Sequence, residues 1–213
     1  MKTLIITGGT GGLGSTVVSR LSRDYHCVLL HRGETPSVDG FKADLGDETS
    51  VRTAIGQAVD RYGAPYGLVH LAGGFATGAV SETSSETWNN MIGLNLTSSF
   101  IVVRECLVNM KRDTPGRIIA ISSEATRTKL ATAAAYTISK TGLSLLIELA
   151  AAELAGSAIT ANALVPGSLD TPAVRKAMPN ARLVPLDRVA DAIAFLLSDA
   201  AASVNGALIP LLG

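Results

Sequence analysis

Short apolar runs alternate with longer stretches of helical periodicity along the whole chain. The runs are TLIIT (3–7), CVLLH (27–31), GLVHLA (67–72), RIIAIS (117–122), ITANALV (159–165) and ALIPLL (207–212). The stretches with helical periodicity are 12–23, 47–61, 84–111, 134–155 and 187–198. Strands that are apolar on both faces and alternate with helices are typical of a parallel sheet that helices cover on both sides. The pattern therefore predicts an α/β protein with a doubly wound parallel sheet in three layers, α/β/α.

Several element boundaries follow from local chemistry. Thr83 and Glu86 have the spacing of a capping box at the start of the 84–111 helix, and Pro115-Gly116 ends that helix. The connection from His31 to Asp44 is too short for a crossover helix, so we expect a loop that leads into a very short strand around Phe41. No linker or repeat interrupts the pattern, which predicts one domain over residues 1–213.

The composition is that of a globular protein without an excess of charge. Hydrophobic residues make up 47% of the 213 residues and charged residues 17%, and 18 basic side chains balance 18 acidic ones. A net charge of zero gives no electrostatic reason to expect a nucleic acid or an anionic membrane as partner. No apolar run reaches the ~18 residues of a membrane span. We expect no metal site.

The N-terminus and the cysteines suggest a cytoplasmic protein. Met1-Lys2 leads at once into an apolar strand, which leaves no room for a signal peptide. The two cysteines, Cys27 and Cys106, lie in apolar runs and are expected to be buried free thiols. Without a secretory signal, the glycosylation sequon at 95–97 is a chance match.

The stretch TGGTGGLG (7–14) lies between the first strand and the first helix. It satisfies both G-x-G-x-x-G and T-G-x-x-x-G-x-G. Positions without side chains let a pyrophosphate approach the backbone N–H groups at a helix N-terminus, so the stretch predicts dinucleotide binding in a Rossmann fold. The alternative is a structural turn. The residues expected to hold the pyrophosphate are Thr7, Gly8, Gly9, Thr10, Gly11, Gly12, Leu13 and Gly14.

The end of the second strand indicates which dinucleotide is bound. An acidic residue that would hold the ribose of NAD is missing there, and His31 and Arg32 take its place. A guanidinium pairs with a 2′-phosphate, so NADP(H) is favoured. The alternative is NAD(H), with Arg32 solvated and Glu34 on the ribose.

Tyr136 and Lys140 are spaced i, i+4 and therefore share one face of the predicted 134–155 helix. An ammonium close to a phenol lowers the phenol's pKa and makes it usable as a general acid or base. This pair alone is a weak signal. Without further support, Tyr136 would be a half-buried aromatic residue and Lys140 a solvated charge.

The combination of motifs resembles the short-chain dehydrogenase/reductase family over nearly the whole chain. The matching segments are TGGTGGLG, ADL (43–45), AGG (72–74), the asparagine of GLNLTSSF (93–100), ISS (121–123), YTISK (136–140) and PGSLDT (166–171). The resemblance implies an enzyme that exchanges hydride between a nicotinamide cofactor and a carbonyl or alcohol. It implies that Tyr136 transfers the proton, Lys140 lowers its pKa and holds the ribose, Ser123 binds the substrate oxygen, and Asn95 supports a proton-relaying water.

The resemblance also implies further cofactor contacts. They are Asp44 and Leu45 at the adenine, Ala72, Gly73 and Gly74 near the adjacent ribose, Tyr136 and Lys140 at the nicotinamide ribose, and Pro166, Gly167, Leu169 and Thr171 along the nicotinamide and pyrophosphate. The substrate pocket is expected near Phe75, 124–130 and 169–178.

The chain departs from the family in two ways. His70-Leu71-Ala72-Gly73 replaces the usual Asn-Asn-Ala-Gly, and we expect His70 to be a packed strand residue. The segment between Thr171 and Val189 is short for a substrate lid. LDTPAVRKAMP (169–179) resembles dihydropteridine reductases, although Ser123 and the His31-Arg32 pair do not fit that branch.

The helix after Lys140 is apolar around most of its circumference and needs burial on more than one side. We therefore expect a homodimer or homotetramer that pairs through the 134–155 helix.

Two further functions compete with the NADP-dependent carbonyl or alcohol enzyme. One is a reductase of quinonoid pterins, and the other is a dinucleotide-sensing regulator, which intact Tyr136, Lys140 and Ser123 disfavour.

Overall fold

The computed structural model describes residues 1–33 and 39–213, and these residues form a parallel sheet of seven strands in the order β3-β2-β1-β4-β5-β6-β7. The predicted doubly wound sheet is confirmed. The strands are β1 (Thr3–Thr7), β2 (His26–His31), β3 (Gly40–Lys42), β4 (Gly67–His70), β5 (Gly116–Ile121), β6 (Ile159–Pro166) and β7 (Leu208–Leu211).

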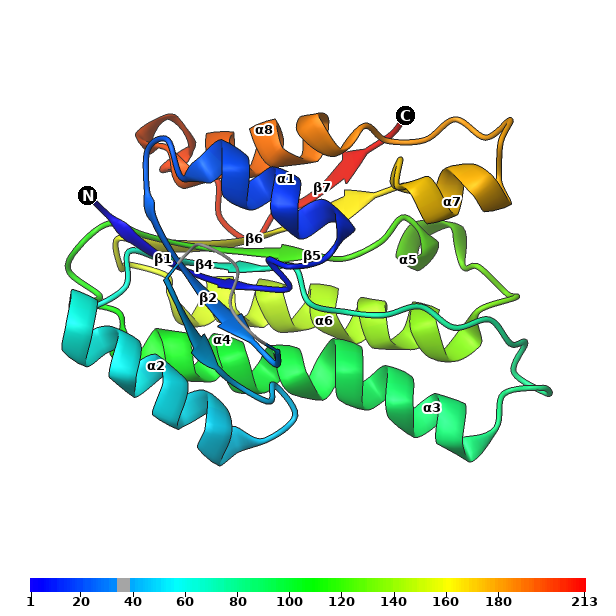
Figure 1. The fold of residues 1–213 in the computed structure, drawn as a ribbon, viewed down its shortest axis with the longest axis horizontal. Helices are drawn as coiled ribbons and strands as arrows, with labels where there is room; N and C mark the ends of the chain where they lie inside the picture. Colours follow the sequence, from blue (N-terminus) through cyan, green and yellow to red (C-terminus); the bar gives the residue numbers. More distant parts are fainter. Residues whose placement is uncertain (34–38) are drawn as a thin grey trace.

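Helices cover both faces of the sheet (Figure 1). Helices α1 and α8 pack together on one face, and α2, α4 and α6 cover the other. The helices are α1 (Gly12–Leu21), α2 (Glu48–Tyr62), α3 (Ser85–Ile92), the π-helical turn η1 (Gly93–Thr97), α4 (Ser98–Asn109), α5 (Ala125–Thr128), α6 (Ala134–Glu153), α7 (Pro172–Ala177), α8 (Leu186–Leu197) and the 3₁₀ turn η2 (Asp199–Ala201).

The sheet separates two hydrophobic cores. Ile5 of β1 and Leu68 of β4 belong to the core under α2, α4 and α6, whereas their neighbours Ile6 and Val69 belong to the core under α1 and α8. Successive strand side chains point to opposite faces, so a strand buried on both sides must be apolar at every position. This explains the uninterrupted apolar runs in the sequence.

Strands β1 and β4 lie side by side at the centre of the sheet, and the order of the strands reverses between them. From β1 the chain winds outward to β2 and β3, and from β4 it winds the opposite way to β5, β6 and β7. Ligands of doubly wound sheets bind outside the carboxyl ends of the strands at such a reversal. Thr7 and His70, the last residues of β1 and β4, are register partners at this point.

Two local expectations have different outcomes. The short strand around Phe41 is confirmed as β3, which pairs in parallel with β2. The capping box at Thr83 is wrong by one residue, because Ser84 is the N-cap of α3 and its hydroxyl accepts a hydrogen bond from the Thr87 amide at 3.1 Å. The Thr83 hydroxyl instead donates to the Ala79 carbonyl at 2.8 Å, which secures the preceding loop.

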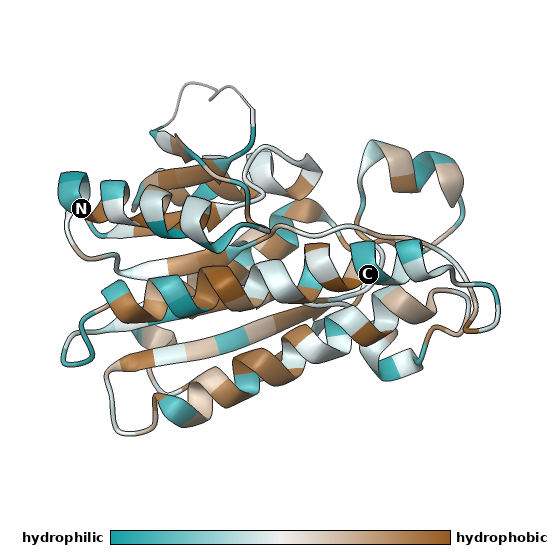
Figure 2. Cartoon of the chain, turned by 90° about the horizontal axis from the view of Figure 1, so that it is seen from below, coloured by the Kyte–Doolittle hydropathy of each residue, from teal (hydrophilic) through white to brown (hydrophobic). Residues whose placement is uncertain are grey.

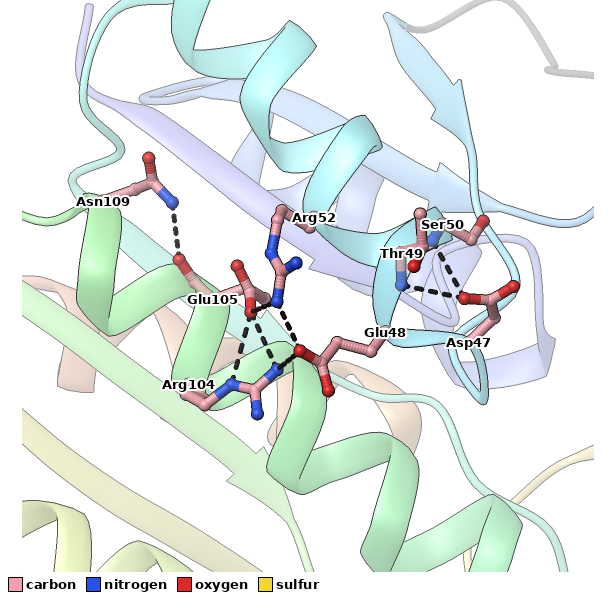
Figure 3. Close-up of polar contacts among 8 residues, drawn as sticks. All are labelled: Asp47, Glu48, Thr49, Ser50, Arg52, Arg104, Glu105 and Asn109. Carbon is pink, nitrogen blue, oxygen red and sulfur yellow. Dashed lines mark hydrogen bonds and ion pairs between the residues drawn. The ribbon is translucent and has the colours of Figure 1, made fainter.

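Ion pairs fasten α2 to α4 (Figure 3). Arg104 of α4 lies 2.8 Å from Glu48 of α2 and 2.9 Å from the neighbouring Glu105, and Arg52 pairs with both carboxylates. The Glu105 side chain is 7% exposed, so the two guanidinium groups compensate a buried charge. The first turn of α2 is held separately, by Asp47, which caps it. The network therefore fixes the helix that continues from the π turn.

The continuous helical stretch Ser85–Asn109 is long and apolar enough, by length and composition alone, to cross a membrane, with a mean hydropathy of 1.4. Half of its most apolar window is buried inside the protein. The core helix of a soluble protein passes the same test, so this stretch is weak evidence for a membrane segment.

Candidate active site

The glycines of the loop after β1 have two different structural roles. A Cβ on Gly14 would lie 2.2 Å from the Gly8 carbonyl oxygen, and a Cβ on Gly9 would lie 2.7 Å from the Leu29 side chain. These two positions are glycine because the loop is packed tightly upon itself and against β2. By contrast, a Cβ on Gly11 would have its nearest described neighbour at 3.4 Å. Gly11 is therefore open toward the space above the loop.

Helix α1 begins at the same place, and its first turn faces this space. Gly11 is the N-cap and supplies no side-chain acceptor, and among the described residues no acidic side chain lies in the first turn. The N–H groups and the helix dipole at such an end favour an anion. The loop and helix therefore fit a pyrophosphate.

A cleft of about 660 Å³ extends from this loop along the carboxyl ends of the strands. Such a volume is in the range of cofactor sites. Twelve of the predicted cofactor residues line it: Gly8, Thr10, Gly11, Gly12, Leu13, Gly14, His31, Arg32, Asp44, Leu45, Ala72 and Gly73.

The remaining predicted cofactor residues lie beside or beneath the cleft. Thr7 is fully buried at the end of β1, and Gly9 packs against Leu29. Pro166 is the last residue of β6, and Gly167 directly follows the strand. Glu34, the alternative ribose ligand, lies outside the described residues.

Leu169 and Thr171 belong to the segment that follows β6. Leu169 forms an isolated bridge with Val184, and the Thr171 hydroxyl caps α7 by accepting from the Val174 amide at 3.3 Å. A Cβ on Gly12 would lie 3.4 Å from the Thr171 methyl group, so this segment reaches the glycine loop.

Residues of the α3 region also line the cleft, and the sequence motifs did not indicate them. They are Asn89, Asn90, Gly93, Leu94 and Ser98. Their spacing of four residues places them on one face of a helix, which is the only signal the sequence holds. Leu30, Gly33, Ala43, Gly46 and Leu71, next to the motif residues, complete the lining.

Lys140 is a buried cation at the inner end of the cleft. Its side chain is 5% exposed, and its ammonium donates a hydrogen bond to the Ile121 carbonyl at 2.8 Å. Burial disfavours the charged form and lowers the pKa of Lys140 to about 8. Helix α6 supplies this lysine at the point where β5 ends.

Tyr136 lies one turn earlier on α6 and is hydrogen-bonded to Ser123. Burial raises the pKa of Tyr136, and the hydrogen bond with Ser123 opposes that shift. The sequence led us to expect that Lys140 would lower this pKa. In the structure, burial is the largest effect on the phenol, and it raises the pKa.

Asn95 is fully buried in the π turn η1 and holds the loop after β4 from both sides. Its carboxamide oxygen accepts from the Gly74 amide at 2.8 Å, and its nitrogen donates to the Gly74 carbonyl at 3.0 Å and to the Ser139 hydroxyl at 3.0 Å. A Cβ on Gly73 would lie 2.8 Å from Asn95 Oδ1 and 3.0 Å from Lys140 Nζ. Gly73 is thus where the cofactor cleft meets Asn95 and Lys140.

Phe75 forms one wall beside the phenol. Its ring contacts the Tyr136 ring edge to face, with centroids 4.9 Å apart, and the side chain is 59% exposed. The loop that carries Phe75 is tied to the segment before α6, because the Gly78 amide donates to the Thr132 carbonyl at 2.8 Å. An exposed aromatic ring next to Tyr136 leaves an apolar surface for a substrate.

The short lid contains one brief helix, α7, as its length allows. Arg175 of α7 pairs with Asp170 at 2.7 Å, and no residue of α7 is buried. Among the described residues, no group of three His, Cys, Asp or Glu side chains could hold a metal ion. The site therefore offers an anion cradle, a phenol, an ammonium and a hydroxyl.

Comparison with known proteins identifies relatives that match nearly the whole chain. The family model described as short chain dehydrogenase matches residues 2–182. The chain is 30% identical to 3-oxoacyl-(acyl-carrier-protein) reductase MabA of Mycobacterium tuberculosis over 226 residues, which cover 100% of this chain and 92% of the relative. It is 27% identical to 2,5-dichloro-2,5-cyclohexadiene-1,4-diol dehydrogenase LinX of Sphingobium indicum, covering 100% and 95%.

Solved structures give the same result. A variant of actinorhodin polyketide ketoreductase with NADPH superimposes with a TM-score of 0.90 at 27% identity, covering 98% of this chain and 95% of that chain. ElxO with NADP bound superimposes with a TM-score of 0.91 at 25% identity, covering 99% and 96%.

Proposed function

The chain belongs to the short-chain dehydrogenase/reductase family and is an oxidoreductase of that family, and on this premise we propose that it reduces carbonyl substrates with NADPH. The observation that carries the proposal is the junction at Gly73. There the glycine-lined cleft meets the Lys140 ammonium and the Asn95 carboxamide, one helical turn from Tyr136.

The glycine loop and the first turn of α1 would hold the pyrophosphate, and Asp44, Leu45 and Ala72 would border the adenosine. The nicotinamide supplies the hydride for reduction. The chain itself must place a carbonyl carbon beside it and deliver a proton to the carbonyl oxygen.

Tyr136 delivers this proton. Burial keeps the phenol protonated at neutral pH, so it holds the proton that the carbonyl oxygen must receive, and the contact with Ser123 opposes the rise of its pKa. The Ser123 hydroxyl, next to the phenol, donates a hydrogen bond to the same oxygen. Lys140 would hold the nicotinamide ribose and, through a water that Asn95 supports, return a proton to Tyr136.

Tyr136→Phe tests this role, because it removes only the hydroxyl. We expect turnover to fall by about 10²-fold or more, while NADPH binding measured by fluorescence changes less than about 3-fold. Turnover close to that of the wild type would remove Tyr136 as the acid.

NADP is favoured over NAD by the charges at the end of β2. Arg32 lines the cleft, and Lys42 of β3 stands opposite His31 in the strand register. The bound NADPH and NADP in two structural relatives support this preference.

Arg32→Asp is expected to weaken NADPH binding by about 10- to 100-fold, the range of a lost charge-assisted hydrogen bond, with little change for NADH. Arg23→Asp, at the far end of α1, is the matched control. Tighter binding of NADH than NADPH by the wild type would contradict the preference.

The substrate is a small-molecule ketone or its alcohol. Because the name of MabA gives 3-oxoacyl-(acyl-carrier-protein) as the compound it reduces, a β-ketoacyl thioester is the first compound to test, and the exposed short lid leaves room for one. A quinonoid pterin tests the alternative. If the protein binds NADPH but consumes none with the thioester, the pterin or any ketone, a dinucleotide sensor would be favoured instead.

Assembly and location complete the proposal. Leu149 of α6 and Phe100 and Val108 of α4 are exposed and border an apolar groove of about 380 Å³, and Leu145 of α6 is exposed as well. Figure 2 views the protein from the side of these helices and shows apolar segments along them. A homodimer through this face would bury them. Leu149→Glu is expected to give a monomer in light scattering, and a monomeric wild type would contradict the pairing.

The two cysteines of the described residues are buried and free, which supports a reducing, cytoplasmic location. Cell fractionation checks it. Residues 1–213 are proposed to form one domain, which predicts a single cooperative unfolding transition.

A further inference from the structure

His70 is a fully buried imidazole, and the reaction described above does not use it. It is the last residue of β4 and the register partner of Thr7, and it lies on the same face of the sheet as Leu68, under α4. A buried polar ring is stable only if both nitrogens are hydrogen-bonded. Both are, as Nδ1 lies 2.8 Å from the Thr7 hydroxyl and Nε2 lies 2.8 Å from the Ser99 hydroxyl.

The chain of hydrogen bonds continues to Asn95 and allows only one arrangement of protons. The Ser99 hydroxyl is 2.7 Å from the Asn95 main-chain carbonyl, which can only accept. The Ser99 hydroxyl therefore donates to that carbonyl and must accept a hydrogen bond from His70 Nε2–H. Nδ1 then has no proton and accepts from the Thr7 hydroxyl. Burial, with the Lys140 charge nearby, lowers the pKa of His70 to about 3, which agrees with a neutral ring.

The end of this chain is the residue that organises the catalytic loop. Asn95 lies in the π turn η1, where the regular helical hydrogen-bond pattern is widened. Ser99, which is hydrogen-bonded to His70, donates to the Asn95 main-chain carbonyl. The Asn95 carboxamide accepts from the Gly74 amide. A displacement of the Asn95 backbone would therefore move Gly74 and the Gly73 junction next to Lys140.

We propose that His70, as the Nε2–H tautomer, is a positioning residue that fixes the Asn95 backbone through Ser99 and so aligns the Gly73–Lys140 junction for proton transfer. This inference rests on the proposed catalytic role of Asn95 and Lys140. It adds a link from the end of β1 to the π turn, which is the connection that the altered motif His70-Leu71-Ala72-Gly73 provides in this chain.

The two nitrogens of His70 can be tested separately. An asparagine oxygen can take the place of Nδ1 but cannot reach Ser99, whereas a glutamine nitrogen extends to the position of Nε2. His70→Asn and Ser99→Ala should each lower kcat by about 10-fold, with the Kd for NADPH changed by less than about 3-fold. The double variant should be no slower than either single one, because both break one link. His70→Gln should keep kcat within about 3-fold of the wild type. His26→Asn should leave kcat unchanged, because His26 is the first residue of β2 and the cleft lies at the carboxyl ends of the strands.

If His70 had a purely structural role, His70→Asn would have a lower melting temperature, but its kcat would equal that of the wild type at temperatures where the variant is folded. That result would overturn the proposal. Additive losses in the double variant would also overturn it.

The tautomer gives a readout that needs no activity. Long-range ¹H–¹⁵N spectra of the ¹⁵N-histidine-labelled protein should show His70 protonated at Nε2 only, from about pH 5 to about pH 8. A proton on Nδ1 would refute the hydrogen-bond chain even if no substrate is found. Absence of ketone reduction by the wild type, with the Nε2–H tautomer present, would instead refute the proposed function and with it the positioning role.

Discussion

Replacing Lys140 by methionine should make the protein more stable and inactive at once. Lys140 is 5% exposed, and the hydrogen bond of its ammonium goes to the neutral Ile121 carbonyl. A buried cation without a paired carboxylate is unfavourable for folding. Methionine has nearly the same length and no charge, so it should fill the same space without that penalty.

The magnitude follows from the pKa of Lys140. Burial lowers it from 10.5 to about 8, a difference of about 2.5 units, and each unit corresponds to about 1.4 kcal/mol, which gives about 3 kcal/mol. Loss of the hydrogen bond to Ile121 offsets about 1 kcal/mol. The net gain in the free energy of unfolding is about 2 kcal/mol, or about 4–8 °C in melting temperature for a chain of this size.

The gain should depend on pH in a defined direction. The folded protein releases the Lys140 proton near pH 8, whereas the unfolded chain keeps it up to about pH 10.5. Between these values the unfolded state binds more protons, so the stability of the wild type rises with pH. The advantage of the methionine variant is therefore complete below about pH 8 and is lost as the pH approaches about 10.5.

Urea unfolding of both proteins at about pH 7 and about pH 9.5 measures this advantage. Lys176→Met, which changes an exposed lysine of α7, is the matched control and should show neither the gain nor its loss. A variant that is less stable than the wild type at about pH 7, or whose advantage is the same at both pH values, would refute the reasoning. Turnover with NADPH should be absent in the variant throughout.

Three further predictions concern stability and binding. Gly14→Ala should lower the free energy of unfolding by about 3 kcal/mol because its Cβ meets the Gly8 carbonyl oxygen at 2.2 Å, whereas Gly11→Ala should keep stability and weaken NADPH binding in a fluorescence titration; equal destabilisation would count against the two glycine roles. Arg117→Ala should cost about 3 kcal/mol in urea unfolding because it removes a fully buried side chain, whereas Asp199→Ala, 4.0 Å away and 82% exposed, should cost less than about 1 kcal/mol; a larger effect of Asp199 would show that the ion pair holds the arginine. Asp47→Ala removes the side-chain cap on the Thr49 and Ser50 amides and should cost about 1 kcal/mol by the same method, and no change would contradict that cap.

Local periodicity was sufficient for the elements that are buried by the sheet. The strand TLIIT and the helix beginning at Gly12 were predicted closely, because burial on both faces or on one stripe leaves a direct pattern. The stretch 84–111 was predicted as one helix. The structure has a π turn inside this stretch, which apolar periodicity could not show, because the turn changes the backbone hydrogen bonds without ending the helix.

Some residues of the site could be predicted from local sequence, and others depend on how distant elements pack together. The glycine loop and the Tyr136–Lys140 pair are each encoded within one segment, so their spacing was readable. The side of α3 that lines the cleft was not, because its position depends on how α3 packs against α6. The burial that raises the pKa of Tyr136 could not be predicted for a related reason, since the sequence shows a neighbouring charge but not the depth of burial.

Gly73 shows why a motif can be recognised before its reason is known. The AGG segment was assigned to the ribose by resemblance alone, and nothing nearby in the sequence explains a glycine there. In the structure, side-chain atoms from two separate elements, Asn95 Oδ1 and Lys140 Nζ, lie within 3.0 Å of the place where a Cβ would stand. Any side chain at this position would separate the carboxamide from the ammonium. The glycine therefore preserves the approach of η1 to α6, a requirement that arises from three segments distant in sequence.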